Sequence, residues 1–360
     1  MKKKVMVGLS GGVDSAVAAS LLKDQGYETV GVTMCLGVAP SPGSKIKCCG
    51  PEEIEDAKRV CRAIGIRHYI LDFARELEED VIKPFVSDYR LGITPNPCVV
   101  CNRRIKFGAL LDKALAMGFD FLATGHYAGT TQTDSGPALI KAKDRRKDQT
   151  YFLYAIRQKA LGNVIFPLAG LTKDEVRKIA LEKNLPVSSK PESQDICFIP
   201  RGGMNAFMKG RFDHEPGDIV DIKGRTIGRH KGIASYTVGQ RTGLGISSPM
   251  PLRVISIDAQ RNMIVAGERK YLFAKGLVAD NINMFTQDIP ERISGKIRYA
   301  HRPAACHAEI SGGELIVKFE EPQESITPGQ SVVIYDGETV LGGGIIRYAT
   351  EKAEEFHKAD

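Results

Sequence analysis

The chain has 360 residues, 42% of them hydrophobic and 26% charged, and its formal charge is +7. This length and composition fit a soluble protein with two or three cored domains, and the mild positive charge would attract a polyanion without identifying one. We expect no membrane span because no run of about 18 apolar residues occurs, and the apolar run after Lys4 is too short for a secretory signal. We therefore expect a cytoplasmic protein.

Apolar runs and helical patterns alternate in the first part of the chain. Two helical patterns begin at Val13 and Pro51 and reach glycine stops at Gly26 and Gly65. Alternating strands and helices predict a parallel sheet that helices cover on both faces. The strands of this sheet are predicted at Val5–Leu9, Thr29–Met34, Arg67–Leu71 and Phe119–Thr124.

The second half of the chain consists of short β-rich runs, such as Arg253–Ile257 and Ser331–Tyr335, separated by Gly, Pro, Asn and Asp. Such runs are typical of small sheets or barrels. A break near Ala274–Gly276 divides them into two modules. We therefore predict an α/β fold with a parallel-sheet domain over residues 1–201, a central β-rich domain over 202–274, a β-barrel over 275–350 and a polar tail over 351–360.

A glycine-rich loop, GLSGGVDS, joins the first predicted strand to the first predicted helix. Its glycines let the backbone approach an anion closely, and the N–H groups at a helix start favour negative charge. The absence of lysine excludes the usual ATP/GTP loop, and the dinucleotide fingerprint does not fit. Asp14 suits a phosphate cradle only if it serves a magnesium ion or a polarised water. The loop residues are Gly8, Leu9, Ser10, Gly11, Gly12, Val13, Asp14 and Ser15.

Two further strand ends are expected at the same edge of the sheet as this loop. Met34 ends the second predicted strand, and Gly125 follows the strand that ends at Thr124. Ligands of open α/β sheets bind outside the carboxyl ends of the strands. Met34 and Gly125 are therefore candidate nucleotide contacts, the alternative being core packing and a turn.

Eight cysteines in a reducing compartment favour thiol or metal chemistry, or plain packing, over disulfides. Cys98 and Cys101 lie in a segment that two prolines make rigid, and Cys197 follows much later. A sulfur relay needs one cysteine that carries a persulfide and a second thiolate that releases the sulfur. The same three thiols could instead hold a [4Fe–4S] cluster with one open iron, or a zinc ion. Basic neighbours that would lower a thiol pKa are Arg103, Arg104 and Lys106.

The other cysteines have a plainer interpretation. Cys61 lies on the apolar face of a predicted helix and Cys306 in a predicted strand, so both are expected in the core. Cys48 and Cys49 follow a loop rich in Gly, Pro, Ser and Lys. For these two and for Cys35, a redox-sensitive loop, a second metal site and no role at all stay open.

A basic run, Lys141–Lys147, precedes the aromatic pair Tyr151 and Phe152. Cations bind phosphates and aromatic rings support splayed bases, so this arrangement is compatible with RNA binding. A solvated surface loop explains the same charges. A second basic segment, Gly224–Gly232, suits either backbone contact or an exposed hairpin.

The SGGVDS sequence resembles the PP-loop ATP pyrophosphatases, which cleave ATP between the α- and β-phosphates and activate a substrate oxygen as an adenylate. With TPNPCVVCNRRIKF, KDQTYF and SQDICF, most of the chain resembles the MnmA family of bacterial tRNA-specific 2-thiouridylases. This resemblance implies an N-terminal domain like that of the adenine nucleotide alpha hydrolases, two β-rich modules of which the last is a β-barrel, and ATP with Mg²⁺. It also implies tRNA and a sulfur donor as partners, with the wobble uridine (position 34) as the target.

Residue roles are carried over from the same resemblance. Cys101 matches the nucleophile and Cys197 the persulfide carrier, and Asp14 joins them as a catalytic candidate. Gly8–Ser15, Met34 and Gly125 match ATP-binding positions. Cys98 departs from the family pattern, in which an aspartate is often found, and this departure raises the cluster alternative. The positions that match contacts to the base or the tRNA are Asn96, Pro97, Cys98, His126, Lys147, Asp148, Gln149, Arg298, Tyr299 and Gln330.

Two other functions compete with this interpretation. A different PP-loop enzyme would adenylate a small molecule, as an argininosuccinate or GMP synthetase does, and would release pyrophosphate without RNA. A non-catalytic RNA-binding module would carry an idle loop, and ATP turnover stimulated by tRNA would exclude it. The three placed thiols and the basic β modules favour the thiolation enzyme over both.

Overall fold

Two compact units make up the chain, which a computed structural model describes over residues 2–37, 51–191, 196–199, 203–208, 210–211 and 215–353. The first unit comprises Met1–Val81, Cys98–Arg201 and Glu338–Val340, and the second comprises Ile82–Pro97, Gly202–Gly337 and Leu341–Asp360. Cys48, Cys49, residues 193–195 of the SQDICF motif and residues 354–360 of the predicted tail lie outside the described residues.

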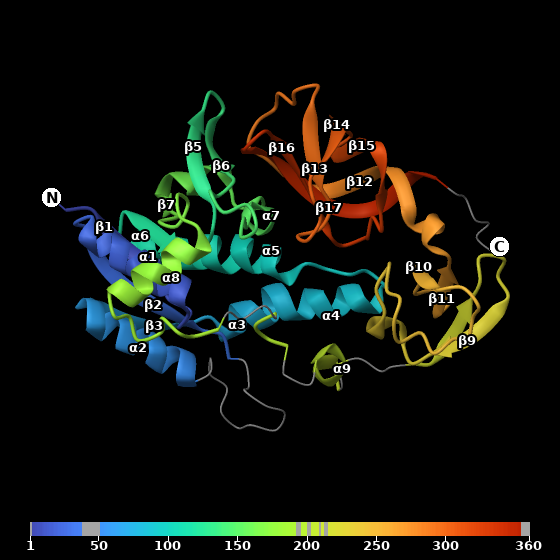
Figure 1. Ribbon diagram of the computed structural model, residues 1–360, viewed down its shortest axis with the longest axis horizontal. Coiled ribbons are helices and arrows are strands. Elements are labelled where there is room, and N and C mark those ends of the chain that lie inside the picture. Colours follow the sequence, from blue (N-terminus) through green and yellow to red (C-terminus); the bar gives the residue numbers. More distant parts are fainter. Residues whose placement is uncertain are drawn as a thin grey trace. The chain divides into compact units, whose positions relative to one another are not determined.

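A five-stranded parallel sheet forms the centre of the first unit (Figure 1). The predicted parallel sheet is confirmed, and its four predicted strands differ from the observed ones by at most two residues at either end. In spatial order, the strands are β3 (Arg67–Asp72), β2 (Glu28–Cys35), β1 (Lys4–Gly8), β4 (Phe121–Thr124) and β7 (Val164–Ile165).

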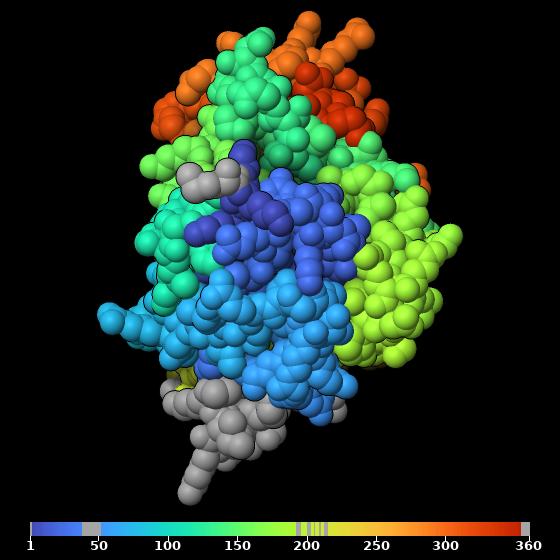
Figure 2. All heavy atoms as spheres, turned by 90° about the vertical axis from the view of Figure 1, so that its left-hand side faces the viewer, coloured from blue at the N-terminus to red at the C-terminus, as the bar shows by residue number. Residues whose placement is uncertain are grey.

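Helices α1 (Val13–Asp24) and α2 (Pro51–Ile64) end at the two predicted glycine stops. Gly26 and Gly65 have φ values of +87° and +64°, the left-handed conformation that ends many helices. One side of the sheet packs on these helices through a buried cluster that includes Val5, Val7, Ala19, Leu22, Ala57 and Cys61. Helix α8 (Lys173–Glu182) packs against α1, and its lime-green residues lie beside the blue N-terminal ones in Figure 2.

The strand order has a switch point between β1 and β4. The chain passes from β1 to β2 on one side, whereas β4 pairs with β1 on the other, with Gly8 in register with Thr124. The carboxyl ends of these two strands therefore lie next to each other, at the place where doubly wound sheets bind ligands.

The thiol-bearing segment forms α5 (Pro97–Cys101), which continues into a π-helix, η2 (Asn102–Leu110), and then α6 (Leu111–Ala116). A hairpin of β5 (Gly129–Thr133) and β6 (Gly136–Ile140) and the short helix α7 (Thr150–Leu153) follow β4. Other short elements of the unit are α3 (Ala74–Leu77), η1 (Glu78–Ile82), which reaches into the second unit, and η3 (Gln158–Asn163).

The second unit holds a four-stranded sheet and a closed barrel. The sheet has the order β10 (Arg253–Asp258), β11 (Met263–Gly267), β8 (Gly217–Val220) and β9 (Thr226–His230). The predicted C-terminal barrel is confirmed, because the first and last strands of its row, β12 and β17, also pair with each other. In spatial order, its strands are β12 (Phe273–Met284), β15 (Glu314–Glu324), β14 (Ala304–Ser311), β13 (Ile293–Lys296), β16 (Ser331–Asp336) and β17 (Thr339–Lys352).

Helix α4 (Lys83–Arg90) belongs to the second unit although it lies early in the chain. The ring of Phe85 lies 6.0 Å from that of Phe207 in α9 (Gly203–Met208), and the Thr94 N–H donates to the Pro328 carbonyl at 3.0 Å. No sequence pattern indicated this excursion, and the module boundaries near residues 201 and 274 stay a prediction. Among the described helices, none combines the length and the hydropathy that crossing a membrane requires.

A substitution at Phe319 tests whether this residue belongs to the barrel core. Its side chain is 2% exposed, and a Cβ on Gly295 would lie 2.9 Å from its ring. We expect Phe319→Ala to lower the free energy of unfolding by about 3–5 kcal/mol, measured by urea titration with circular dichroism, because a cavity replaces the ring. Ile310→Ala, at a side chain that is 39% exposed, should change it by about 0.5 kcal/mol or less. Equal effects would contradict the assignment of this core.

Candidate active site

Hydrogen bonds within the loop fix the turn between β1 and α1. The Leu9 N–H donates to the Val32 carbonyl at 2.7 Å, and the Ser10 N–H donates to Ser15 Oγ at 3.2 Å. Gly11 has a φ of +73°, and a Cβ there would lie 2.7 Å from the Glu53 carbonyl oxygen. Only glycine fits at this position, so the loop is a tightly built turn that leads into a helix N-terminus.

Gly125 presses against the same loop from the end of β4. A Cβ on Gly125 would lie 2.6 Å from the Ser15 nitrogen, so a side chain there would collide with the start of α1. Met34 lies near the end of β2 and is partly buried. The structure thus brings the loop, Gly125 and Met34 to the carboxyl edge of three neighbouring strands, as the sequence predicted.

Asp14 is engaged in an ion pair. Its carboxylate accepts hydrogen bonds from Lys173 Nζ at 2.7 and 2.8 Å and from the Tyr127 hydroxyl at 2.9 Å. A carboxylate already paired with an ammonium is a poor ligand for Mg²⁺, so this geometry does not fit the magnesium role suggested for it. The pair instead holds a cation beside the glycine loop.

Lys173 is a site residue that the sequence analysis missed. It is 6% exposed and is the first residue of α8, directly after the N-cap Thr172, whose side chain forms a capping box with Glu175. The TKDE sequence is a readable signal for that helix start. Nothing local, however, indicates that the lysine meets an aspartate 159 positions earlier.

The three thiols lie within electrostatic reach of one another. Cys101 is buried, whereas Cys98 and Cys197 are exposed as residues. Protein atoms nevertheless surround the sulfur atoms of these two residues closely enough to desolvate them. Burial raises the pKa of Cys98 and Cys101, and it raises the pKa of Cys197 to about 12 with a further contribution from the other two thiols. At neutral pH all three are therefore thiols.

Lys106 is the cation that lowers the pKa of all three thiols, against the larger effect of burial. It lies in the π-helix η2, where the backbone pairs residues five apart, so it returns toward the side of the helix that carries Cys101. A Cβ on Gly108 would lie 2.9 Å from the Arg103 carbonyl oxygen, which explains a glycine in this turn. Of the three expected basic neighbours, only Lys106 acts on the thiols, since Arg103 and Arg104 contribute to none of these shifts.

The thiols as arranged do not form a metal site. Within the described residues, no group of three or more His, Cys, Asp or Glu side chains could hold a metal ion. This geometry does not fit the [4Fe–4S] or zinc alternatives. Cys61 and Cys306 are core residues, as predicted, and burial raises their pKa values to about 11 and about 12.

Two of the predicted tRNA contacts use their polar atoms inside the first unit. Asp148 is 6% exposed and accepts from the Ala142 N–H at 3.0 Å and the Thr150 hydroxyl at 2.6 Å. Gln149 exchanges backbone and side-chain hydrogen bonds with the backbone of Tyr127 at 2.8 and 2.9 Å. Lys147, which is partly exposed, donates its backbone N–H to the Asp144 carbonyl at 3.1 Å.

The basic run is also largely neutralised within the unit. Lys143 pairs with Glu175 at 2.8 Å, Arg146 lies 3.6 Å from Asp144, and Arg145 pairs with Glu338. His126 packs against Phe107 and Phe166 and shares a 2.7 Å hydrogen bond with Thr124. Burial and the charge of Lys106 hold the pKa of His126 well below its ordinary value, so this ring is neutral.

Five predicted contacts lie in the second unit and are described there by themselves. Gln330 donates to the Thr94 carbonyl at 2.9 Å, and Arg298 donates to the Val238 carbonyl at 3.0 Å and to Thr327. Tyr299 is 37% exposed, with Lys296 Nζ 5.2 Å from its ring centre. Tyr299 therefore offers a surface for stacking. The remaining candidates, Asn96 and Pro97, are partly exposed and buried, respectively, at the start of α5.

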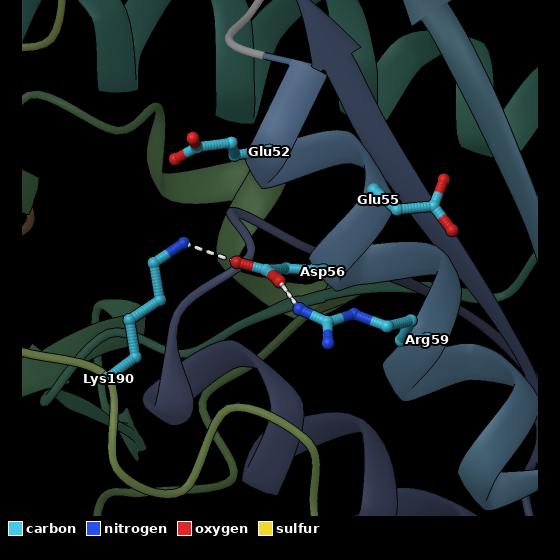
Figure 3. A pocket seen from close by; sticks show the side chains of 5 residues that line it. All are labelled: Glu52, Glu55, Asp56, Arg59 and Lys190. Atoms are coloured by element: carbon cyan, nitrogen blue, oxygen red, sulfur yellow. Dashed lines mark hydrogen bonds and ion pairs between the residues drawn. The ribbon is translucent and has the colours of Figure 1, made fainter.

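A pocket of about 340 Å³ lies elsewhere in the first unit, lined by Glu52, Glu55, Asp56, Arg59 and Lys190 (Figure 3). Asp56 lies between Lys190, whose Nζ is 2.5 Å from its carboxylate, and Arg59. Burial raises the pKa of Asp56, but the hydrogen bonds and charges of Lys190 and Arg59 lower it by more. The pKa therefore lies below its ordinary value, and the carboxylate is charged. None of the predicted site residues lines this pocket.

Three family models match the chain in succession. Residues 3–201 match the tRNA methyl transferase HUP domain, residues 205–268 the tRNA methyl transferase PRC-barrel domain, and residues 274–346 the aminomethyltransferase beta-barrel domain. A curated protein of Syntrophus aciditrophicus named tRNA-specific 2-thiouridylase MnmA 1 is 51% identical, over 98% of this chain and 95% of its own length. The chain belongs to the MnmA family.

Another member, the tRNA-specific 2-thiouridylase MnmA of Acetivibrio thermocellus, is 44% identical over 96% of this chain and 99% of its own length. Among solved structures, a 4-thiouridine synthetase in complex with RNA and ATP resembles 54% of this chain and 45% of its own, with 21% identity and a TM-score of 0.33. That structural likeness is too slight to support an argument. The MnmA relatives match nearly the whole chain, so both units lie within the family.

The Asp14–Lys173 pair yields a stability prediction. Asp14→Asn leaves a buried ammonium without its anion, so we expect the free energy of unfolding to fall by roughly 1–3 kcal/mol, measured by urea denaturation. The double variant with Lys173→Met should recover most of that loss. The matched control is Asp24→Asn, which breaks the exposed pair with Lys183 and should change stability by about 1 kcal/mol or less. A smaller loss for Asp14→Asn than for the control would refute the structural role of the pair.

The charge of Lys106 yields a prediction about thiol reactivity. Because only thiolates react and the pKa of Cys197 is about 12, its alkylation by iodoacetamide should keep accelerating from pH 8 to pH 11. Lys106→Met removes the one favourable charge, so the rate at pH 8 should fall about tenfold for each unit by which the pKa rises. Peptide mass spectrometry gives the rate at each cysteine. Arg104→Met should leave these rates unchanged, and an equal effect of both variants would count against the specific role of Lys106.

Proposed function

We propose that this chain is a tRNA 2-thiouridylase, which uses ATP to adenylate the 2-oxygen of a uridine in tRNA and then replaces that oxygen with sulfur. The proposal rests on one observation: the first unit contains both a phosphate-type loop and a group of three thiols. A phosphate-type loop lies at the switch point of the sheet, and three thiols lie within electrostatic reach of one another. The names of the full-length relatives supply the substrate class.

The loop provides the adenylation site. The triphosphate, carrying Mg²⁺ on its own oxygens, would lie against the Gly8–Ser15 loop and the N–H groups at the start of α1, where the helix dipole favours an anion. Lys173 adds a positive charge beside this loop. The uridine 2-oxygen attacks the α-phosphorus, the bond to the β-phosphate breaks and pyrophosphate leaves. The N3 proton passes to solvent, and the former carbonyl oxygen becomes part of a good leaving group.

The thiols provide the sulfur transfer. Sulfide, as the donor, would attack C2 of the adenylated base directly and displace AMP. A persulfide carrier would instead pass its outer sulfur to the thiolate of Cys197, the thiol at the surface, and leave as a thiol, so that Cys197 carries a terminal sulfur. This sulfur attacks C2 of the base, the C2–O bond breaks and AMP departs. The Cys101 thiolate then attacks the Cys197 sulfur, which releases the thiocarbonyl and forms a Cys101–Cys197 disulfide. An external thiol reductant reopens that disulfide.

The tRNA would be held by exposed groups of both units. Lys147 and Tyr299 offer a cation and an aromatic face, and Asn96, Pro97 and Cys98 are assigned to the target base, taken as the wobble uridine. Asp148, Gln149, His126, Arg298 and Gln330 support such contacts from within, because their polar groups are engaged in internal hydrogen bonds. Because tRNA is the proposed substrate, we also propose a cytoplasmic location.

Formation of 2-thiouridine tests the function. The purified protein is incubated anaerobically with ATP, Mg²⁺, unmodified tRNA and either sulfide or a persulfide donor, and the digested RNA is examined by mass spectrometry. We expect 2-thiouridine with the wild type and, with the persulfide donor, a loss of about a hundredfold or more in Cys101→Ser and Cys197→Ser because both thiols take part in bond-forming steps. Cys98→Ala should retain activity with the persulfide donor.

Cys306→Ala, which alters a thiol of the barrel core, is the matched control and should stay active. If Cys98→Ala is inactive with both donors and the wild type shows cluster absorption, the relay is wrong and a three-thiol cluster replaces it. Pyrophosphate release triggered by a small amino acid, without sulfur in the tRNA, would instead point to a small-molecule PP-loop enzyme.

A further inference from the structure

Asn102 carries a buried oxygen with no hydrogen-bond partner. The residue is 2% exposed, and its Nδ2 donates to the Phe152 carbonyl at 2.9 Å. Its Oδ1 has no hydrogen-bond partner. Among the side chains that the structure describes, it is the one buried nitrogen or oxygen atom without a partner. Leaving a buried acceptor unsatisfied costs roughly 1–3 kcal/mol, so such an atom in a folded protein needs a reason.

The orientation of this amide is determined by its surroundings. An amide nitrogen, not an oxygen, must face the Phe152 carbonyl, because two oxygens would repel each other. The Oδ1 atom is therefore held on the other side of the amide plane. Asn102 thus presents a fixed acceptor that can be satisfied only by a donor from outside its present set of contacts.

The position of Asn102 relates this acceptor to the reacting groups. It directly follows Cys101 and begins the π-helix. It also lies four residues after Cys98, a spacing that places two side chains on the same face of a helix. The acceptor consequently belongs to the same short helical segment as two of the three thiols.

We propose that Asn102 Oδ1 accepts a hydrogen bond from the N3–H of the target uracil and thereby selects uridine over cytidine. This inference rests on the proposed function. Uracil offers one ring N–H donor, at N3 between two carbonyl acceptors, whereas the N3 of cytosine is itself an acceptor. Two acceptors facing each other leave both unsatisfied, and a site built to bind a donor rejects an analogue that lacks it.

The same hydrogen bond assists adenylation. An acceptor at N3–H shifts electron density of the imide toward the neighbouring carbonyl oxygens, which makes the 2-oxygen a better nucleophile. An amide oxygen is too weak a base to take the proton, so Asn102 orients the ring and the proton leaves to solvent during the reaction. Triphosphate oxygens are acceptors only and cannot satisfy Oδ1.

Binding of altered tRNAs tests the proposal. Wild-type protein with α,β-methylene ATP is titrated with tRNA that carries uridine, 3-deazauridine or cytidine at the target position. The 3-deaza ring has C–H in place of N3–H. We expect both altered tRNAs to bind about tenfold more weakly than the uridine tRNA, the value of one lost hydrogen bond in a buried site. Equal affinity for uridine and 3-deazauridine would overturn the proposal without any variant.

Asn102→Ala should remove the discrimination, so that uridine and 3-deazauridine tRNAs bind within about twofold of each other. The matched control is Asn163→Ala, which also removes an amide donor from a carbonyl, that of Asp120, and should keep the wild-type ratio. Persistence of the wild-type ratio in Asn102→Ala refutes the contact. So does a loss of ATP affinity with an unchanged tRNA ratio, which would assign Oδ1 to the adenine amino group.

Failure of this inference is distinguishable from failure of the proposed function. Wild-type formation of 2-thiouridine on the uridine tRNA establishes the function whatever the binding ratios are. If that product forms but 3-deazauridine binds as well as uridine, only the role of Asn102 is wrong.

Discussion

The ion pair between Asp14 and Lys173 is the contact on which the first unit depends. It joins the first turn of α1 to the first turn of α8, and the Tyr127 hydroxyl ties the segment after β4 to the same carboxylate. Three segments far apart in the sequence therefore meet at one group beside the glycine loop. Because Lys173 is buried, loss of its partner leaves a buried charge, so the pair favours the arrangement in which the loop and its flanking helices stay together.

Tyr127 extends this connection. Its backbone exchanges hydrogen bonds with Gln149, and Asp148 beside it accepts from Ala142 and Thr150. Phe152 in the following helix accepts from Asn102, the residue next to Cys101. A continuous series of hydrogen bonds and chain neighbours thus links the nucleotide loop to the thiols. Asp148 and Gln149 of the KDQ sequence therefore have a structural role, because their polar atoms form hydrogen bonds within the first unit.

The thiols face two opposing effects. Burial raises their pKa values and so favours the thiol, while the charge of Lys106 favours the thiolate. The π-helix decides which cation has this effect, since pairing residues five apart brings Lys106 back toward Cys101. Because burial is the larger effect, the pKa of each of the three thiols lies above its ordinary value.

Local sequence determined the parallel sheet, both helix stops, the glycine loop, the core positions of Cys61 and Cys306 and the C-terminal barrel. These features follow from side-chain periodicity and from backbone conformations that only glycine adopts readily, and both are properties of neighbouring residues. Tertiary structure alone decided that Lys173 meets Asp14, that Lys106 rather than Arg103 or Arg104 acts on the thiols, that Asp148 faces inward and that Asn102 retains an unpaired oxygen. Such contacts join residues distant in the chain, or depend on a helix type without a sequence signature, so no local pattern encodes them.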